Sequence, residues 1–386
     1  MEDQQSVVQI KDLYLNFYTY DGVVKALDGV SLDLRKGEIL GLVGETGCGK
    51  SVTSLSTLSI VIPPGRIEKG QIDINLKGKK YDLLSLNQPT MARVRGKYIS
   101  MIFQEPRAAL NPVYTVGDQV AEVYFHHRKA ELVEAAAAQL KKDMEGAFIL
   151  KRAIYKLELG LYEKMRSNPK SLRLRLALRI PLIRRFRNRM KSEAKKFIVE
   201  TLKSLNIPDP ARVVDMYAHE LSGGMAQRVV IAMALSCNPV MLIADEPTTS
   251  LDVTVQAQIL LLIKDLQRRL HTSILYVTHD LGVVAETCDR VAVMYAGNVA
   301  EIADVVSLFK KPLHPYTRAL LESIPRPGQK FTSIPGTVPS LVNPPRGCRF
   351  NDRCSYALDR CINVKPELVE VDKDHFVACH LYYGGK

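Results

Sequence analysis

The sequence predicts an α/β fold in which a parallel sheet carries a phosphate-binding loop, and three observations support this. Residues 44–51 read GETGCGKS directly after the apolar run Ile39–Val43, so a buried strand leads into a glycine-rich loop. Two further apolar runs, Val240–Ala244 and Ser273–Thr278, each follow a helical stretch, which is typical of parallel strands. The chain has 386 residues, of which 46% are hydrophobic. This length predicts roughly two to three structural units with a sizeable core.

The glycine-rich loop matches the G-x-x-x-x-G-K-S pattern of P-loop NTPases at every fixed position. Its glycines let successive N–H groups point at phosphate oxygens, Lys50 reaches the β- and γ-phosphates, and the Ser51 hydroxyl can ligate Mg²⁺. The stretch Ser51–Ser59 predicts a helix whose N-terminus favours the same anion. Only the backbone of Cys48 is needed for this, so we expect its thiol to be open to alkylation. The residues expected to contact the nucleotide here are Gly44, Glu45, Thr46, Gly47, Cys48, Gly49, Lys50, Ser51 and Val52.

The remaining elements follow from local patterns. From Val7 to Leu34, apolar and polar residues alternate around Asp21-Gly22, which predicts a small antiparallel sheet. Tyr98–Phe103 predicts another short strand, and the pattern is helical from Val116 to about Leu205. Six prolines between residues 325 and 345 predict an extended surface crossing to a small Cys-rich tail. We expect a nucleotide-binding domain over 1–300, with its core at about 1–103 and 240–300, a helical subdomain at about 104–239, and a C-terminal extension over 301–386.

The net charge of +12 is concentrated in one segment. Residues 128–196 hold 20 Lys and Arg against 7 Asp and Glu, whereas the rest of the chain holds 33 basic and 34 acidic residues. Charge informs association rather than fold, and three hypotheses stay open for this basic insertion: a solvated helical hairpin, a patch on anionic lipid, and nucleic-acid contact. The arginines considered for lipid contact are Arg173, Arg175, Arg179, Arg184, Arg185, Arg187 and Arg189.

No membrane span or export signal is evident in the sequence. No run of about 18 or more uninterrupted apolar residues exists, and the N-terminus lacks both a basic and an apolar region of the signal-peptide kind. The sequence therefore predicts a soluble protein made in the cytosol.

Two carboxylates end the predicted strand Val240–Ala244. Asp245 fits the role of holding Mg²⁺ through its water shell, and Glu246 fits the role of polarising the water that attacks the γ-phosphate. Such acid pairs often only cap the next helix. The functional interpretation is favoured by Leu221–Gln227, LSGGMAQ, which lies about 20 residues upstream and offers Ser222 and the amides of Gly223 and Gly224 to an anion.

The LSGG stretch resembles the signature of ATP-binding cassette (ABC) ATPases. The resemblance implies a head-to-tail dimer in which this signature contacts the γ-phosphate held by the other subunit. It also implies a Q-loop glutamine at Gln104 that touches Mg²⁺, a D-loop aspartate at Asp252, and a switch histidine at His279. The adenine ring would stack on Phe17, with Tyr18 or Tyr20 as alternatives.

Three longer stretches resemble the oligopeptide/dipeptide subfamily of ABC importer ATPases: 103–112 (FQEPRAALNP), 244–258 (ADEPTTSLDVTVQAQ) and 314–321 (HPYTRALL). The resemblance implies an ATP-hydrolysing motor on the cytoplasmic face of the cell membrane, importing peptides or related solutes such as oligosaccharides. Its implied partners are a paralogous ATPase, two membrane permeases and an extracellular solute-binding protein. The competing hypothesis is a soluble ABC ATPase acting on nucleic acid or ribosomes, which only the basic insertion supports.

Four of the seven cysteines gather in the tail, at Cys348, Cys354, Cys361 and Cys379. Cytosolic proteins rarely rely on disulfides, so the cluster suggests a metal site. Their spacing leaves Zn²⁺, an iron–sulfur cluster and no metal all open. The subfamily resemblance implies a [4Fe–4S] cluster held by these four thiolates, which we therefore expect.

Overall fold

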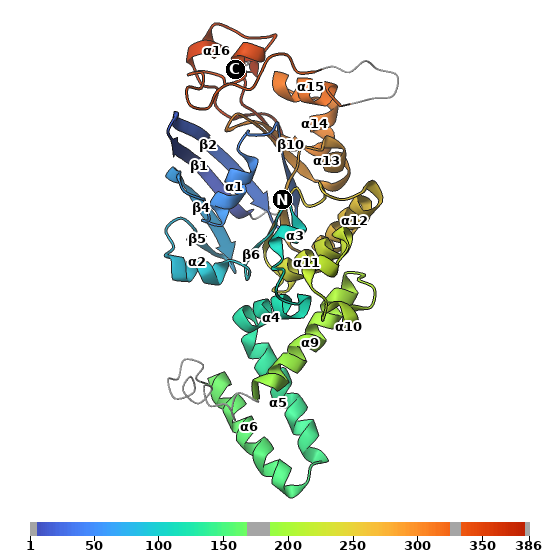
Figure 1. The fold of residues 1–386 in the computed structure, drawn as a ribbon. Helices are drawn as coiled ribbons and strands as arrows, with labels where there is room; N and C mark the ends of the chain where they lie inside the picture. Colours follow the sequence, from blue (N-terminus) through green and yellow to red (C-terminus); the bar gives the residue numbers. More distant parts are fainter. Residues whose placement is uncertain (1–5, 168–185, 325–332, 383–386) are drawn as a thin grey trace. The chain divides into compact units, whose positions relative to one another are not determined.

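The computed structural model describes residues 6–167, 186–324 and 333–382, which belong to two compact units (Figure 1). The first unit comprises residues 1–104, 239–249 and 256–386, and the second comprises residues 105–238 and 250–255.

The first unit contains an antiparallel sheet of order β2-β1-β4-β5 and a larger sheet of order β11-β12-β10-β9-β3-β8-β7-β6. In the larger sheet β9, β3, β8, β7 and β6 run parallel, whereas β10, β12 and β11 are antiparallel additions beyond β9. The strands are β1 (Ser6–Thr19), β2 (Gly22–Arg35), β3 (Ile39–Val43), β4 (Gly65–Leu76), β5 (Lys79–Asp82), β6 (Ile99–Ile102), β7 (Met241–Asp245), β8 (Ser273–Val277), β9 (Arg290–Tyr295), β10 (Asn298–Asp304), β11 (Val369–Asp372) and β12 (His375–Val377).

The helices of the first unit are mostly short. They are α1 (Lys50–Thr57), α2 (Gln88–Val94), α13 (Leu281–Thr287), α14 (Val305–Lys310), α15 (Pro315–Glu322) and α16 (Arg360–Asn363), with 3₁₀ turns at Asn351–Arg353 and His380–Tyr382. Helix α12 (Val253–Leu270) begins in the second unit and continues in the first.

The strand pattern read from the sequence explains this architecture. Strands β1 and β2 pair as a hairpin with Thr19 opposite Gly22, and several of their apolar residues, among them Leu13, Leu15 and Val30, are fully buried. All five residues of β3 are buried, as expected for a central parallel strand. The predicted α/β fold with an N-terminal antiparallel sheet is thus confirmed.

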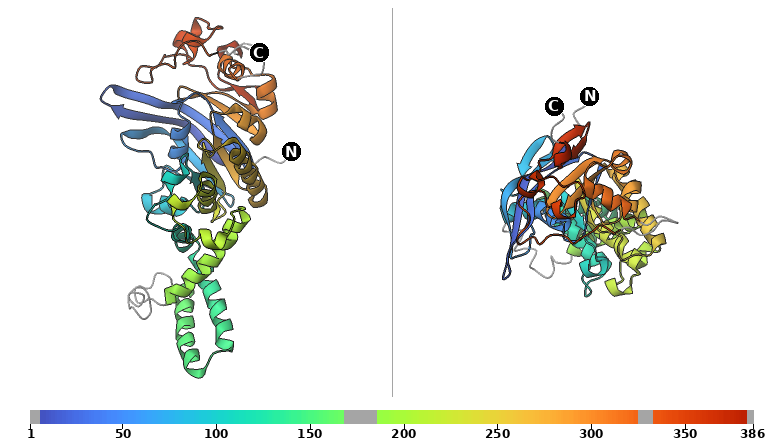
Figure 2. Two further views of the ribbon diagram at one scale, coloured as in Figure 1. Left: turned by 45° about the vertical axis from the view of Figure 1, so that its right-hand side comes forward. Right: turned by 90° about the horizontal axis from the view of Figure 1, so that it is seen from above.

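The second unit is helical, as predicted from Val116 onward. Helices α5 and α6 lie side by side as a hairpin (Figures 1 and 2). None of the helices in the described ranges is both long and apolar enough to cross a bilayer. The helices are α3 (Pro106–Ala109), α4 (Val116–His127), α5 (Lys129–Glu145), α6 (Ile149–Ser167), α9 (Phe186–Ser204), α10 (Pro210–Val213) and α11 (Gly223–Leu235), with a 3₁₀ turn at Ala218–Glu220.

Arg189 joins three helices of this unit. Its guanidinium, on α9, forms ion pairs with Asp143 of α5 and with Glu158 of α6, the latter at 3.1 Å. Only 20% of its side chain is exposed, and Tyr162 donates a second hydrogen bond to Glu158. The expectation that Arg189 serves lipid is therefore wrong, because its charge is already neutralised inside the helical unit. Residues 173, 175, 179, 184 and 185 lie outside the described ranges.

Candidate active site

The P-loop joins β3 to α1, and its first and last fixed glycines are required by the backbone. Gly44 has φ +149° and Gly49 has φ +104°, both unfavourable for residues with a Cβ. A Cβ at Gly44 would overlap the carbonyl oxygen of Met294, and one at Gly49 would lie 2.7 Å from the Leu27 side chain. The neighbouring strands thus leave space for glycine alone at these two positions.

The Lys50 side chain folds back over the P-loop, so that its ammonium hydrogen-bonds residues of that same loop. It donates to the carbonyl oxygens of Gly44 at 2.7 Å and of Glu45 at 3.1 Å, and the residue is only 7% exposed. The Cys48 sulfur lies 3.6 Å from the same ammonium, so all three hydrogen-bond partners of Lys50 are neutral and no carboxylate competes with an anion for it.

Next in the chain, the Ser51 hydroxyl donates to Asp245 at 3.3 Å and so links the loop to the end of β7. Burial raises the pKa of the Asp245 carboxyl, and the Ser51 hydrogen bond opposes that shift. A buried carboxylate beside a hydroxyl offers the hard oxygen ligands that Mg²⁺ prefers, and a cation there would offset the cost of burying the charge. These two residues therefore fit Mg²⁺.

Glu246 is held by three side chains. Its Oε2 accepts hydrogen bonds from Gln104 Nε2 at 2.9 Å and from Thr249 Oγ1 at 3.0 Å, and its Oε1 lies 3.0 Å from His279 Nδ1. Its backbone is left-handed, with φ +45°, and its N–H donates to the Val277 carbonyl of β8. The structure thus brings the predicted residues Gln104, Glu246 and His279 into one cluster and directs the carboxylate into it.

The signature and D-loop residues lie in the second unit. Ser222 caps α11 by accepting a hydrogen bond from the Met225 N–H at 3.3 Å, and Gly223 and Gly224 form the first turn. Asp252 accepts a hydrogen bond from the Val255 N–H. The helix N-terminus expected at the signature is therefore present.

The three aromatic candidates for adenine stacking differ in environment. Phe17 packs against the core of the first unit, whereas the Tyr18 hydroxyl donates to Glu68 at 2.8 Å. Tyr20, at the turn between β1 and β2, is fully exposed. The assignment to Phe17 stays a prediction.

The structure corrects the prediction for Cys48 and adds Thr249 to the residues around the site. The Cys48 thiol is 1% exposed, and burial raises its pKa even though Lys50 lies beside it, so the expected reactivity toward alkylation is wrong. The contact of Thr249 with Glu246 could not be predicted, because a threonine three residues after an acidic residue carries no distinctive pattern.

The [4Fe–4S] prediction is wrong. Within residues 6–167, 186–324 and 333–382, no group of three or more His, Cys, Asp or Glu side chains is arranged to hold a metal ion. Cys361 accepts a hydrogen bond from the Leu358 N–H, and Cys379 packs with Leu313 and Val377.

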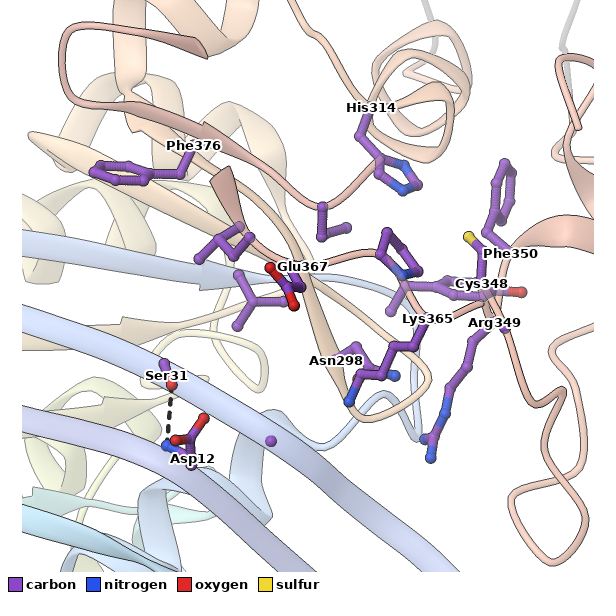
Figure 3. Close-up of a pocket in the computed structure, with 18 of the residues that line it drawn as sticks. Asp12, Ser31, Asn298, His314, Cys348, Arg349, Phe350, Lys365, Glu367 and Phe376 are labelled. Carbon is purple, nitrogen blue, oxygen red and sulfur yellow. Dashed lines mark hydrogen bonds between the residues drawn. The ribbon is translucent and has the colours of Figure 1, made fainter. Parts of the chain in front are cut away.

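A cavity of about 650 Å³ lies between the N-terminal sheet and the C-terminal extension, and no P-loop residue lines it. Figure 3 shows Asp12 and Ser31 on the strand side and His314, Cys348 and Phe350 across from them. Its cations are already paired, since Arg349 and Lys365 both form ion pairs with Asp28, at 3.2 and 3.0 Å. The cavity therefore has no part in the nucleotide site.

Two family models match the chain. Residues 27–249 match the ABC transporter family, and residues 300–361 match the oligopeptide/dipeptide transporter C-terminal region. The first match contains the P-loop, the signature and both carboxylates described above.

Curated relatives are similar over nearly the whole length. The chain is 42% identical over 382 residues to the oligopeptide transport ATP-binding protein OppD of Bacillus subtilis (strain 168), covering 98% of this chain and 89% of OppD. It is 41% identical over 381 residues to the dipeptide transport ATP-binding protein DppD of the same organism, covering 98% and 95%. Among solved structures, the dimeric ABC transporter cassette MJ0796 shares the fold with a TM-score of 0.54 at 22% identity, covering 77% of this chain and 98% of MJ0796.

Proposed function

This chain belongs to the ABC transporter family as an ATP-hydrolysing subunit, and we propose that the solutes whose import it powers are oligopeptides or dipeptides. The observation that carries the proposal is the match of both the cassette and the C-terminal region to peptide transporters, over 97% or more of this chain in the relatives compared. The competing hypothesis of a soluble ATPase acting on nucleic acid is not favoured by these relatives.

In the proposed reaction, the residues of the first unit bind the phosphates, activate water and hold the metal ion. The loop amides and Lys50 bind the β- and γ-phosphates, and Glu246 orients the attacking water and accepts its proton. Gln104, Thr249 and His279 fix the direction of that carboxylate, a role that their contacts of 2.9 to 3.0 Å with it support. Ser51, Asp245 and Gln104 would hold Mg²⁺, which when bound neutralises charge on the phosphates.

The second unit contributes residues to the ATP site of the partner ATPase. A helix N-terminus with two glycines presents amide donors to an anion, which supports contact of Ser222, Gly223 and Gly224 with the γ-phosphate bound by another ATPase subunit. We propose a head-to-tail dimer with a paralogous ATPase, docked on two permeases at the cytoplasmic face of the membrane. ATP closes the dimer and hydrolysis reopens it, because the two states differ in their affinity for ATP.

Reconstitution tests the transport proposal. The chain, its partner ATPase, the two permeases and the solute-binding protein are placed in proteoliposomes, and uptake of a labelled oligopeptide is measured with ATP inside. We expect uptake that requires ATP, exceeds uptake of a labelled oligosaccharide, and stops when the solute-binding protein is omitted. Equal uptake of both solutes would contradict the peptide assignment.

The positive charge of the basic insertion, residues 128–196, supports a second proposal, that this segment contacts anionic lipid. Arg189 does not contribute to this contact, because it is ion-paired within the helical unit. The other six arginines considered for lipid contact lie between residues 173 and 187, where each charge near a membrane surface contributes about 1 kcal/mol of attraction that salt weakens.

Replacing these six arginines by glutamine is expected to weaken binding to phosphatidylcholine vesicles containing phosphatidylglycerol by roughly tenfold or more, because the attraction is electrostatic. Replacing them by lysine is the matched control and should preserve binding. Vesicle sedimentation at low and high salt measures both. Equal binding of the unmodified chain to vesicles of phosphatidylcholine alone would exclude lipid attraction, and salt-sensitive binding to RNA instead would favour the nucleic-acid hypothesis.

A further inference from the structure

The C-terminal extension reaches the P-loop of its own chain at Glu45. The Arg353 guanidinium forms a two-point ion pair with this carboxylate, with N–O distances of 2.8 and 3.2 Å. The Tyr316 hydroxyl accepts a hydrogen bond from the Glu45 N–H at 2.9 Å. Both the side chain and the backbone of the second loop residue are therefore held by residues far along the chain. We call Tyr316 and Arg353 the bracket.

The Arg353 side chain is itself fixed. Only 4% of it is exposed, and it also donates to the Tyr295 hydroxyl at 3.1 Å and to the Pro335 carbonyl at 2.8 Å. A buried guanidinium with this many fixed partners has lost its rotamer freedom before ATP arrives. Because Arg353 is fixed, its ion pair restricts the position of the Glu45 side chain.

Tyr316 is placed by the motif HPYT at the start of α15. Its ring is fully buried, with ring centroids 4.5 Å from Tyr295 and 5.4 Å from Phe350. The preceding His314 caps α15 by accepting the Tyr316 N–H at 3.0 Å, and burial lowers the pKa of His314 to about 4, so the ring stays neutral and able to accept.

The start of α15 is in turn fastened to β10. The fully buried Glu301 accepts the N–H groups of Leu313 and His314, both at 2.8 Å, and lies 2.7 Å from His375 Nε2. Contacts thus run from β10 through α15 to the P-loop. They explain the HPYT motif, since its residues place the Tyr316 hydroxyl within hydrogen-bond distance of the Glu45 N–H.

We propose that Tyr316 and Arg353 are positioning residues for nucleotide binding, through which the C-terminal extension sets the affinity of the P-loop for ATP. Two effects combine. Holding Glu45 orders the first half of the loop in advance, so less conformational entropy is lost when phosphates bind. Pairing Glu45 with Arg353 also neutralises a carboxylate in a loop that must accept a polyanion. The bracket rests on the proposed function, since it has a role only if the loop binds ATP.

Titration of the full-length chain with ATP and Mg²⁺ tests the bracket. Arg353→Gln and Tyr316→Phe are each expected to raise the Kd for ATP about threefold to tenfold, while the turnover rate at saturating ATP, measured with the partner ATPase, stays within about twofold. Tyr316→Phe removes a single oxygen and keeps the buried ring, so it remains informative if Arg353→Gln folds poorly.

The double variant Glu45→Gln/Arg353→Gln separates positioning from a general loss of structure. Removing the unpaired carboxylate should restore affinity to within about threefold of the unmodified chain, whereas simple loss of packing would make the double variant bind no better than Arg353→Gln.

Two matched controls lie in the same unit and do not touch the loop. Arg290→Gln breaks a buried ion pair with Glu38 and Asp33, and Tyr382→Phe removes a hydroxyl bonded to Arg318 and Leu313. Neither should change the Kd. Unchanged affinity in both bracket variants, or an equal loss in the controls, overturns the proposal. If Lys50→Ala binds ATP as tightly as the unmodified chain, the proposed ATP site itself is wrong and the role of the bracket fails with it.

Discussion

Glu246→Gln is expected to lower ATP turnover by about 100-fold or more while ATP stays bound. The reason is that the variant loses the carboxylate that activates the attacking water but keeps the groups that bind the nucleotide. Glutamine has the same shape and keeps one oxygen that can accept from Gln104 and Thr249, whose contacts with Glu246 are 2.9 and 3.0 Å. It lacks the negative charge needed to orient water and take its proton. The phosphate ligands at the P-loop are untouched, so the nucleotide should be retained.

Phosphate release in the presence of the partner ATPase measures turnover, and gel filtration with labelled ATP measures retention. Glu322→Gln, an exposed carboxylate on α15, is the matched control and should turn over normally. Release at the normal rate by Glu246→Gln would remove Glu246 from the reaction and leave another group as the base.

Lys50→Ala should raise the Kd for ATP by about 10- to 100-fold, the range for losing a charge-assisted hydrogen bond. The effect is expected to be large because the ammonium is 7% exposed and its hydrogen-bond partners at 2.7 and 3.1 Å are neutral carbonyls, so no carboxylate competes with phosphate for its charge. The alanine also frees the carbonyls of Gly44 and Glu45, which loosens the loop.

Lys50→Met keeps the length of the side chain and fills the same space, so it isolates the charge from the packing. We expect both variants to weaken ATP binding, with the exposed Lys36→Ala as an unaffected control. Titration with ATP and Mg²⁺ measures all three. Normal affinity in Lys50→Met would mean that the loop amides alone bind the phosphates.

The parts of the site that could be predicted from the sequence are those formed by residues close together along the chain. The P-loop, the strand that ends in Asp245 and Glu246, and the capped signature helix each depend on local patterns, and the structure contains all three elements. The bracket could not be predicted, since Tyr316 and Arg353 are 271 and 308 residues from Glu45 and meet it only through tertiary packing.

Side-chain direction explains the failures. Four cysteines lie within 32 residues of one another, yet spacing along the chain does not determine whether their sulfurs adopt a metal-binding arrangement, and within the described residues none is found. The sequence predicts a reactive Cys48 because the P-loop needs only its backbone, but its side chain is buried in the core. Arg189 carries one of many charges in a basic run, and no local pattern reveals that Asp143 and Glu158 neutralise it.

The order of the larger sheet limits how the chain can be shortened. Strand β12 pairs with β10 through Glu301–Val377 and Ile302–Phe376, so the C-terminal extension continues the same hydrogen-bonded sheet that contains β3. A version cut after β10 would expose that strand as an open edge, whose unpaired N–H and C=O groups can join the edge of another molecule. Truncation would thus create an aggregation-prone surface, and a useful shorter version must retain the chain through residue 377.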